Sequence, residues 1–332
     1  MPTRSIIKFN SSSAVLLISS VLFIFPAFFV ACNSGDKKKP PEPYRPTAEP
    51  EIQSIGVTVK NLDKLLAQWN DAMQKPDTIR TIDLRRSLEN ELLKQTNLRF
   101  DELRTELETS WVMRNREVIA AALGFSKKPE AMVPLVNSVV SDPVPGVREK
   151  ALLGLSRLAD PNTPVDLVAG RLGADFTDGE QWNASLALKN LAAAGAKMDA
   201  ALPALRENLK NRNPVIRVHC AIALGHARDT VSTPLLLSLL KDERALVGAA
   251  AADALGRIGD PETAKNLIDS LASQEYAIRT EARKALARMN NGEDLGPESG
   301  PWRRWLQKLE LGKPASAPAL EPAASNASSN VK

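Results

Sequence analysis

The chain has 332 residues, of which 43% are apolar and only 5% are aromatic. It is too long for an average single globule, and its bias toward Ala and Leu is typical of stacked helices. The formal net charge is +4, but Lys and Arg are interspersed with Asp and Glu, so we expect no binding of nucleic acid. Two cysteines are too few for a disulfide framework.

Residues 1–31 have the features of an export signal, because Arg4 and Lys8 precede a long apolar run. A permanent transmembrane anchor is the alternative, since the run is long enough to span a bilayer. The end of the run favours the signal: Phe29-Val30-Ala31-Cys32 resembles the lipobox of bacterial lipoproteins, although Leu is usual where Phe29 stands. The resemblance implies cleavage before Cys32 and attachment of acyl chains such as palmitate, which hold a protein on a membrane.

Residues 32–54 are rich in Lys and Pro and are interpreted as a tether. Pro-rich chains stay extended at about 3.1 Å per residue, so the tether would hold the folded part away from the membrane. Asn33 follows the lipidation site, whereas Asp at that position resembles a signal for retention in the inner membrane. We therefore expect a lipid anchor in the bacterial envelope, with the outer membrane facing the periplasm favoured over the inner membrane.

Residues 55–114 are predicted to be helical without a clean repeat. One amphipathic helix carries apolar residues from Leu62 to Met73, a second covers 82–93, and a third runs from Phe100 to Trp111. Terminal repeats of solenoids are atypical because one of their faces meets water. We predict a helical N-terminal cap, with a separate binding module as the alternative.

Residues 115–289 contain an internal repeat. Residues 216–240 and 247–271 align at an offset of 31 residues, which places Ala254-Leu255-Gly256 on Ala223-Leu224-Gly225. Periods of this length are typical of stacked helix pairs, and the apolar residues recur at helical spacing. The same frame gives six repeat starts, at Asn115, Val147, Trp182, Ile216, Val247 and Ile278.

The predicted fold is therefore all-α: an α-solenoid of stacked antiparallel helix pairs, with about six repeats and a helical cap at each end. An apolar residue followed by Arg, then Ala-Leu, then a Gly-Asp or Asp-Pro turn resembles the HEAT repeat. The closest resemblance is to its short bacterial form, shared with phycobilisome lyase-like proteins. In that form a turn Asp and a helix Arg six residues apart tie a repeat together, and Asp142 and Arg148 match them, with Asn211 and Arg217 as a looser match.

Residues 290–311 are predicted to form a C-terminal capping helix on which Trp302 and Trp305 share a face. Paired Trp residues could serve as a ligand platform, but closing the open end of the core is the commoner role. Residues 312–332 are mainly Ala, Ser, Pro and Asn, so we predict a disordered tail.

The sequence offers no recognisable catalytic constellation, so we expect no enzyme activity, no metal and no other cofactor. Similar repeats build deoxyhypusine hydroxylase, which binds iron through His-Glu pairs, but His219 and His226 are followed by Cys220 and Ala227. We expect one histidine to be packed and the other to lie at a helix end, near the helix dipole. Cys220 is predicted to be a small buried hydrophobic residue.

Binding of another protein is the function that these observations favour. We expect the second helices of the repeats to line the concave side of the solenoid and to present the binding surface. The candidate residues are Asn137, Arg171, Arg206, Ser238, Asn266 and Asp269. The prediction is a lipid-anchored envelope protein acting as a HEAT-repeat scaffold. The alternative is an enzyme or enzyme subunit of the phycobilin-lyase or deoxyhypusine-hydroxylase-like repeat group.

Overall fold

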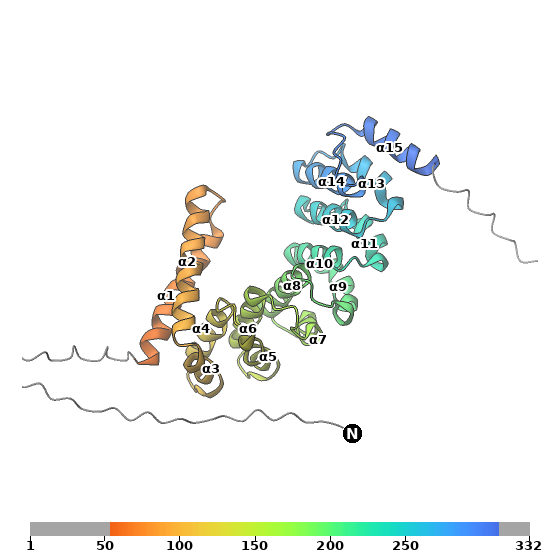
Figure 1. Ribbon diagram of the computed structural model, residues 1–332. Helices are drawn as coiled ribbons and strands as arrows, with labels where there is room; N and C mark the ends of the chain where they lie inside the picture. The colour runs from red at the N-terminus through yellow and green to blue at the C-terminus, as the bar shows by residue number, and fades with distance from the viewer. Residues whose placement is uncertain (1–53, 312–332) are drawn as a thin grey trace, which may run out of the picture. The chain divides into compact units, whose positions relative to one another are not determined.

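The computed structural model describes residues 54–311, which contain helices and no strands. They belong to one compact unit. The fold is an all-α solenoid of stacked helix pairs (Figure 1), as the sequence predicts. The predicted export signal, the lipidation site Cys32, almost all of the tether and the C-terminal tail lie outside the described residues.

The first helices of the repeats form a continuous row. They are α4 (Met113–Leu123), α6 (Pro145–Leu158), α8 (Asp178–Ala193), α10 (Pro214–His226), α12 (Ala245–Ile258) and α14 (Tyr276–Met289). Each of these helices contacts the next one in the row. Every predicted repeat start lies near the beginning of one of them.

The second helices are shorter. They are α5 (Met132–Ser141), α7 (Val165–Ala169), α9 (Leu202–Glu207), α11 (Thr233–Leu239) and α13 (Ala264–Ser270). Short 3-10 segments adjoin them at Pro129–Ala131, Gly170–Leu172, Asp199–Ala201, Asn208–Lys210, Thr230–Ser232 and Pro261–Thr263. Each second helix packs on the first helix that follows it, as α5 does on α6. Within residues 54–311, Figure 1 shows the first helices on the inner side of the bend and the second helices on the outer side.

Glycines in the Ala-Leu-Gly triplets allow the first helices to approach closely. A Cβ atom on Gly225 would lie 2.6 Å from the Cα of Ala254, and one on Gly256 would lie 2.5 Å from the Cα of Ala285. Real Cβ atoms do not come this near to a backbone, so any larger residue would push the helices apart. The repeated triplet therefore sets the spacing of the row.

A recurring arginine fastens the loop that enters a first helix. In four repeats its guanidinium donates to the backbone carbonyl six residues earlier, at 2.8 to 2.9 Å. The pairs are Arg116 with Ser110, Arg148 with Asp142, Arg217 with Asn211 and Arg279 with Ser273. These loop carbonyls have no partner in a helix, and the arginines supply one.

The loop carboxylates bind the arginine of the preceding repeat. Asp142 accepts hydrogen bonds from Arg116 at 2.8 and 3.2 Å, and Asp242 accepts one from Arg217 at 2.8 Å. The resemblance paired the side chains of Asp142 and Arg148, but Arg148 reaches only the backbone carbonyl of Asp142. The carboxylate thus connects successive repeats, because the stacking of helices brings it next to the earlier arginine.

The N-terminal helices α1 (Ile55–Gln74), α2 (Ile79–Leu98) and α3 (Phe100–Thr109) precede the repeats. Both α1 and α2 contact α4, and α3 packs on α4 and α5. The predicted apolar stripes are buried in α1 and α3, with two exceptions: Met73 is 46% exposed and Trp111 is 90% exposed. Trp111 lies in the loop after α3, where no helix covers it.

Helix α15 (Ser299–Leu311) packs on α13 at the C-terminal end of the described chain. Trp302 is fully buried, and its Nε1 donates to the carbonyl of Gly296 at 2.8 Å. Trp305 lies edge-on against it, with 5.8 Å between the ring centroids. The two Trp side chains thus fill the end of the core.

Candidate functional site

Two of the six predicted binding residues form ion pairs with buried carboxylates. Arg206 donates to both carboxylate oxygens of Asp229, at 2.5 and 2.7 Å. Arg171 lies 3.8 Å from the buried carboxylate of Glu180 and covers the ring of Phe176. These side chains hold the helix pairs together, and sequence spacing did not indicate their partners.

The other four predicted residues, Asn137, Ser238, Asn266 and Asp269, are exposed. Asn266 and Asp269 line one cavity of ≈480 Å³, whereas Asn137 lines another of ≈390 Å³. All of them belong to second helices, which lie on the outer side of the bend in Figure 1 and not on the concave side where we expected them. The structure therefore does not gather the six residues into a single surface.

A set of exposed apolar side chains lies where the loops enter α4, α10, α12 and α14, whereas α6 and α8 have none at this position. Its members are Trp111, Met113, Val215, Leu246 and Tyr276, and we call them the loop edge. Trp111, Leu246 and Tyr276 are 90%, 71% and 74% exposed. The periodicity of apolar residues in the sequence did not predict that these side chains are exposed, because exposure depends on whether another helix packs over them.

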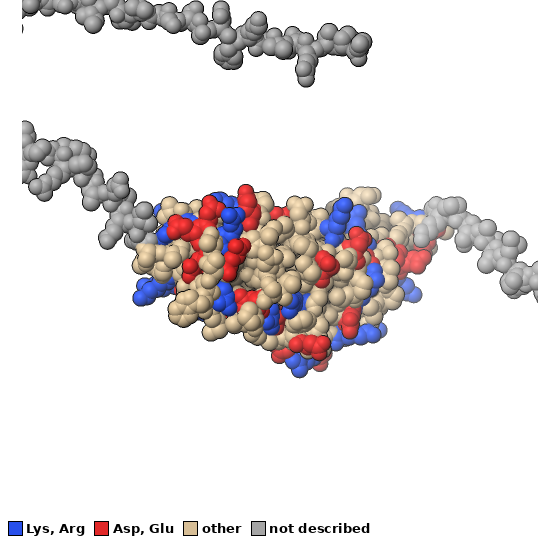
Figure 2. All heavy atoms as spheres, turned by 90° about the horizontal axis from the view of Figure 1, so that it is seen from below, with Lys and Arg blue, Asp and Glu red and all other residues tan. Residues whose placement is uncertain are grey.

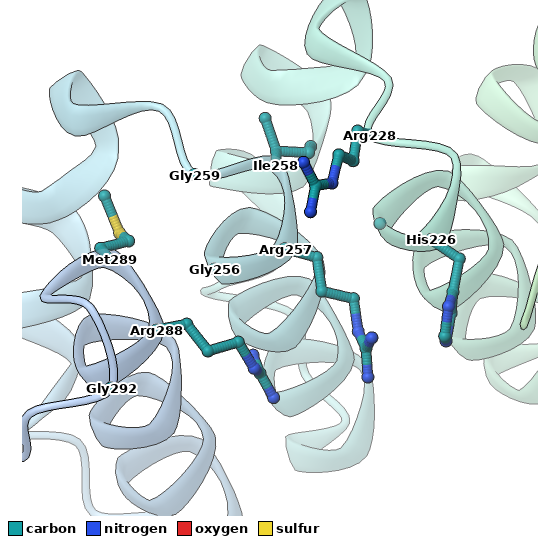
Figure 3. A pocket seen from close by; sticks show the side chains of 10 residues that line it. His226, Arg228, Gly256, Arg257, Ile258, Gly259, Arg288, Met289 and Gly292 are labelled. Carbon is teal, nitrogen blue, oxygen red and sulfur yellow. The ribbon is translucent and has the colours of Figure 1, made fainter.

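A cationic cleft lies at the opposite, carboxyl-terminal ends of α10, α12 and α14 (Figure 3). It has a volume of ≈770 Å³, and its titratable lining residues are His226, Arg228, Arg257 and Arg288. Figure 3 shows the side chains of His226, Arg257 and Arg288 pointing the same way from three successive helices. These three positions are 31 residues apart, so the repeat frame could have revealed them.

One carboxylate compensates part of the charge of the cationic cleft. Asp253 lies 2.8 Å from Nε of Arg257 and 2.7 Å from Nη2 of Arg288. The exposed side chain of Arg228 forms no hydrogen bond or ion pair with the residues of the described range 54–311. Burial, together with the neighbouring Arg257, lowers the pKa of His226 below its usual value. Three arginines against one aspartate leave an excess of positive charge.

The other histidine lies deep in the row of first helices. The side chain of His219 is buried, with its Nδ1 2.9 Å from Oγ of Ser185. Burial, assisted by Lys189, lowers the pKa of His219 to about 4. Cys220 is also buried, which raises the pKa of its thiol to about 12. Both residues occupy packing positions in α10.

Two further properties concern residues 54–311 only. No three His, Cys, Asp or Glu side chains in this range come together in a group that could hold a metal ion. No helix in the same range has the length and apolar character needed to cross a membrane. On the face shown in Figure 2, basic and acidic side chains are interspersed rather than gathered by sign.

One part of the solenoid is similar to a known family. A family model described as HEAT repeats matches residues 202–287, which run from α9 into α14. No curated protein matches the sequence. A match to this part of the chain assigns no activity, because the same fold serves many functions.

Three solved structures illustrate the likeness. Human deoxyhypusine hydroxylase in complex with glycerol is 18% identical, with 71% of this chain and 98% of that chain covered and a TM-score of 0.33. The CpcE and CpcF complex of phycocyanin lyase from Nostoc is 19% identical, with 81% and 98% covered and a TM-score of 0.39. A designed armadillo repeat protein is 16% identical, with 57% and 99% covered and a TM-score of 0.46. Similarities at this level carry no argument about function.

Proposed function

We propose that this protein is a scaffold that binds another protein along its solenoid and is anchored in a bacterial envelope by lipid on Cys32. The observation that carries the binding function is the loop edge. Val215, Leu246 and Tyr276 occupy this position on the three successive first helices α10, α12 and α14. Contiguous exposed apolar patches mark interaction sites, and aromatic residues are enriched in protein interfaces. Trp111 and Tyr276 are such residues, and both are largely exposed.

The anchoring rests on the sequence of the first residues. Cys32 follows an apolar run and a lipobox-like sequence, and a Lys- and Pro-rich tether separates it from the solenoid. Acyl chains on Cys32 would insert into a bilayer at about 0.8 kcal/mol for each buried methylene. Asn33, next to that residue, supports an outer-membrane location facing the periplasm.

Native mass spectrometry of the protein extracted from its own membranes in mild detergent tests the anchoring. We expect a chain that begins at an acylated Cys32. The Cys32→Ser variant should lose the acyl mass and leave the membrane fraction. A mature chain that keeps residues 1–31, or a serine variant that stays in the membrane, would contradict lipidation at this site.

Substitution of the loop edge tests the binding function independently. We expect the double variant Leu246→Ser, Tyr276→Ser to lose most of the protein that co-isolates with the parent chain, because it removes the two most exposed side chains of the C-terminal repeats from the loop edge. Val231→Ser is the matched control, since Val231 is 66% exposed but lies outside the loop edge. Equal recovery of the partner with the double variant and the control would refute the role of the loop edge.

A further inference from the structure

Arg157 occupies the same position in its repeat as His226, Arg257 and Arg288 do in theirs, and it binds a carboxylate. Arg157 lies nine residues after the recurring Arg148, just as Arg288 lies nine residues after the equivalent Arg279. Nη2 of Arg157 donates to the carboxylate of Glu89 in α2 at 2.6 Å. Glu89 belongs to α2, so the carboxylate comes from a helix that lies outside the repeats and packs against the row of first helices.

The residues equivalent to Arg157 differ among the later repeats. The third repeat has the buried Ala192, which separates Arg157 from the later repeats. His226, Arg257 and Arg288 then follow, one in each repeat. The residues of the described chain that line the cleft belong to the repeats, apart from Gly292 in the loop after α14.

Loop N–H groups bind some of the last carbonyls of the helices at the cleft. A carboxyl-terminal helix end carries partial negative charge, which would disfavour an anion. In each helix, however, a loop N–H binds one of the last carbonyls: Asp229 binds Leu224 at 3.1 Å, Gly259 binds Leu255 at 2.9 Å and Gly292 binds Ala287 at 2.7 Å. The cationic side chains are therefore not all required to compensate free carbonyls, and the side chain of Arg228 has no partner among residues 54–311.

The cleft itself shows that carboxylates fit its arginines. Asp253 bridges Arg257 and Arg288 with both of its oxygens. Packed helices lie about 8–10 Å apart, and a polyproline II chain rises about 3.1 Å per residue with three residues per turn. Side chains on one face of such a peptide thus repeat at about 9 Å, close to the spacing of successive repeats.

We infer that the cationic cleft binds an acidic, extended segment of the partner protein, with Asp or Glu three residues apart facing Arg257 and Arg288, next to His226. This inference rests on the proposed scaffold function and names the chemistry of the segment that the scaffold holds. Arg228 would bind a carboxylate at the rim of the cleft. Residues 312–332 do not supply such a segment, because they contain one Glu and two Lys.

Fluorescence anisotropy with a defined probe tests the inference on the full chain in mild detergent. The probe is a labelled peptide of repeated Glu-Pro-Pro triplets, and the matched peptide carries Gln in place of Glu. We expect the acidic peptide to bind and the Gln peptide not to bind. Salt should weaken the binding, because exposed charges are screened. Equal binding of both peptides, or no binding of the acidic one, would overturn the inference.

Two variants locate the binding site, because they should change the affinity for the acidic peptide in opposite directions. Arg257→Gln combined with Arg288→Gln should lower the affinity for the acidic peptide by about tenfold or more, since charge-assisted hydrogen bonds are lost. Asp253→Asn should strengthen it, because the competing internal carboxylate is removed. A purely structural role for these residues predicts no gain with Asp253→Asn, so an unchanged or weaker affinity of that variant counts against the site.

A charge-matched control and a second anion complete the design. Arg212→Gln with Arg303→Gln removes two exposed arginines outside the cleft and should leave the affinity unchanged. The second anion is a single-stranded DNA oligonucleotide. If it binds as tightly as the peptide and the same cleft variant abolishes its binding, the cleft is a general polyanion site and the inference is wrong. If the acidic peptide does not bind, only this inference is overturned. The scaffold function is tested separately, by the effect of the loop-edge variants on the native partner.

Discussion

Replacement of Glu180 by Gln is the sharpest test of how the repeats are held together. Glu180 is fully buried, and its carboxylate accepts bonds from Nε of Arg148 at 2.6 Å and from the backbone N–H of Thr177 at 3.2 Å. Burial raises the pKa of Glu180, but the bonds from Arg148 and Thr177 outweigh it and hold this pKa below its usual value. The substitution removes the ion-pair partner of Arg148, whose side chain is itself mostly buried.

The expected cost follows from the burial of the pair. Removing one partner of a buried ion pair costs about 3–5 kcal/mol, and the Gln carbonyl still accepts one bond, so we expect about 3 kcal/mol. With a urea m-value of about 3 kcal/mol per molar, the unfolding midpoint should fall by about 1 M. Urea titration followed by far-ultraviolet circular dichroism measures this shift.

A neighbouring pair supplies the control. Asp178 and Arg212 are linked at 2.5 Å, but their side chains are 75% and 81% exposed. Asp178→Asn should therefore cost less than about 1 kcal/mol, because water screens an exposed pair. The reasoning is refuted if Glu180→Gln costs no more than this control.

The pH dependence gives a second check on Glu180. Its folded-state pKa is lowered, so the stability that it contributes is present above the unfolded pKa of about 4.3 and is lost as the pH falls further. The difference between the parent chain and Glu180→Gln should thus be full at neutral pH and shrink in acid. A difference that stays constant down to the acid transition would show that the charge plays no part.

Two other predictions concern packing in the row of first helices. The pKa of His219 falls to about 4 in the fold, so stability should decrease as the pH drops below about 6.5, by about 2 kcal/mol at pH 5, and His219→Gln should abolish that slope in urea titrations. Gly256→Ala should cost about 1–3 kcal/mol, because the new Cβ would clash with Ala285. Gly170→Ala is its control, since nothing lies within 4 Å of the added atom; equal thermal midpoints for the two would contradict the close approach.

The sequence predicted the repeat and the helical content because both depend on local periodicity. The offset of 31 residues and the Ala-Leu-Gly triplets at Gly225 and Gly256 are visible in the chain, and each first helix begins close to its predicted start. Gly and Pro at Gly259-Asp260-Pro261 likewise end α12 and start the next turn. Such signals act within a few residues, so one sequence is enough to interpret them.

The candidate site was harder to predict, because it depends on which side chains meet across repeats. The spacing of six residues suggested a pair between Asp142 and Arg148, yet the carboxylate of Asp142 binds Arg116. Arg206, expected at a binding surface, is held by Asp229. These partners are 23 and 26 residues apart and meet only when the helices stack.

Sequence alone thus determined that this protein is an α-solenoid of HEAT-like helix pairs, since apolar residues at helical spacing require neighbouring pairs to bury them. The tertiary structure decided which residues that stacking leaves available. Trp111 belongs to an apolar pattern but lies in an exposed loop. Arg257 forms an ion pair with Asp253, whereas the side chain of Arg228 lines the cleft and has no partner within the described residues. Exposure and charge pairing are properties of the space between helices, which the order of residues does not specify.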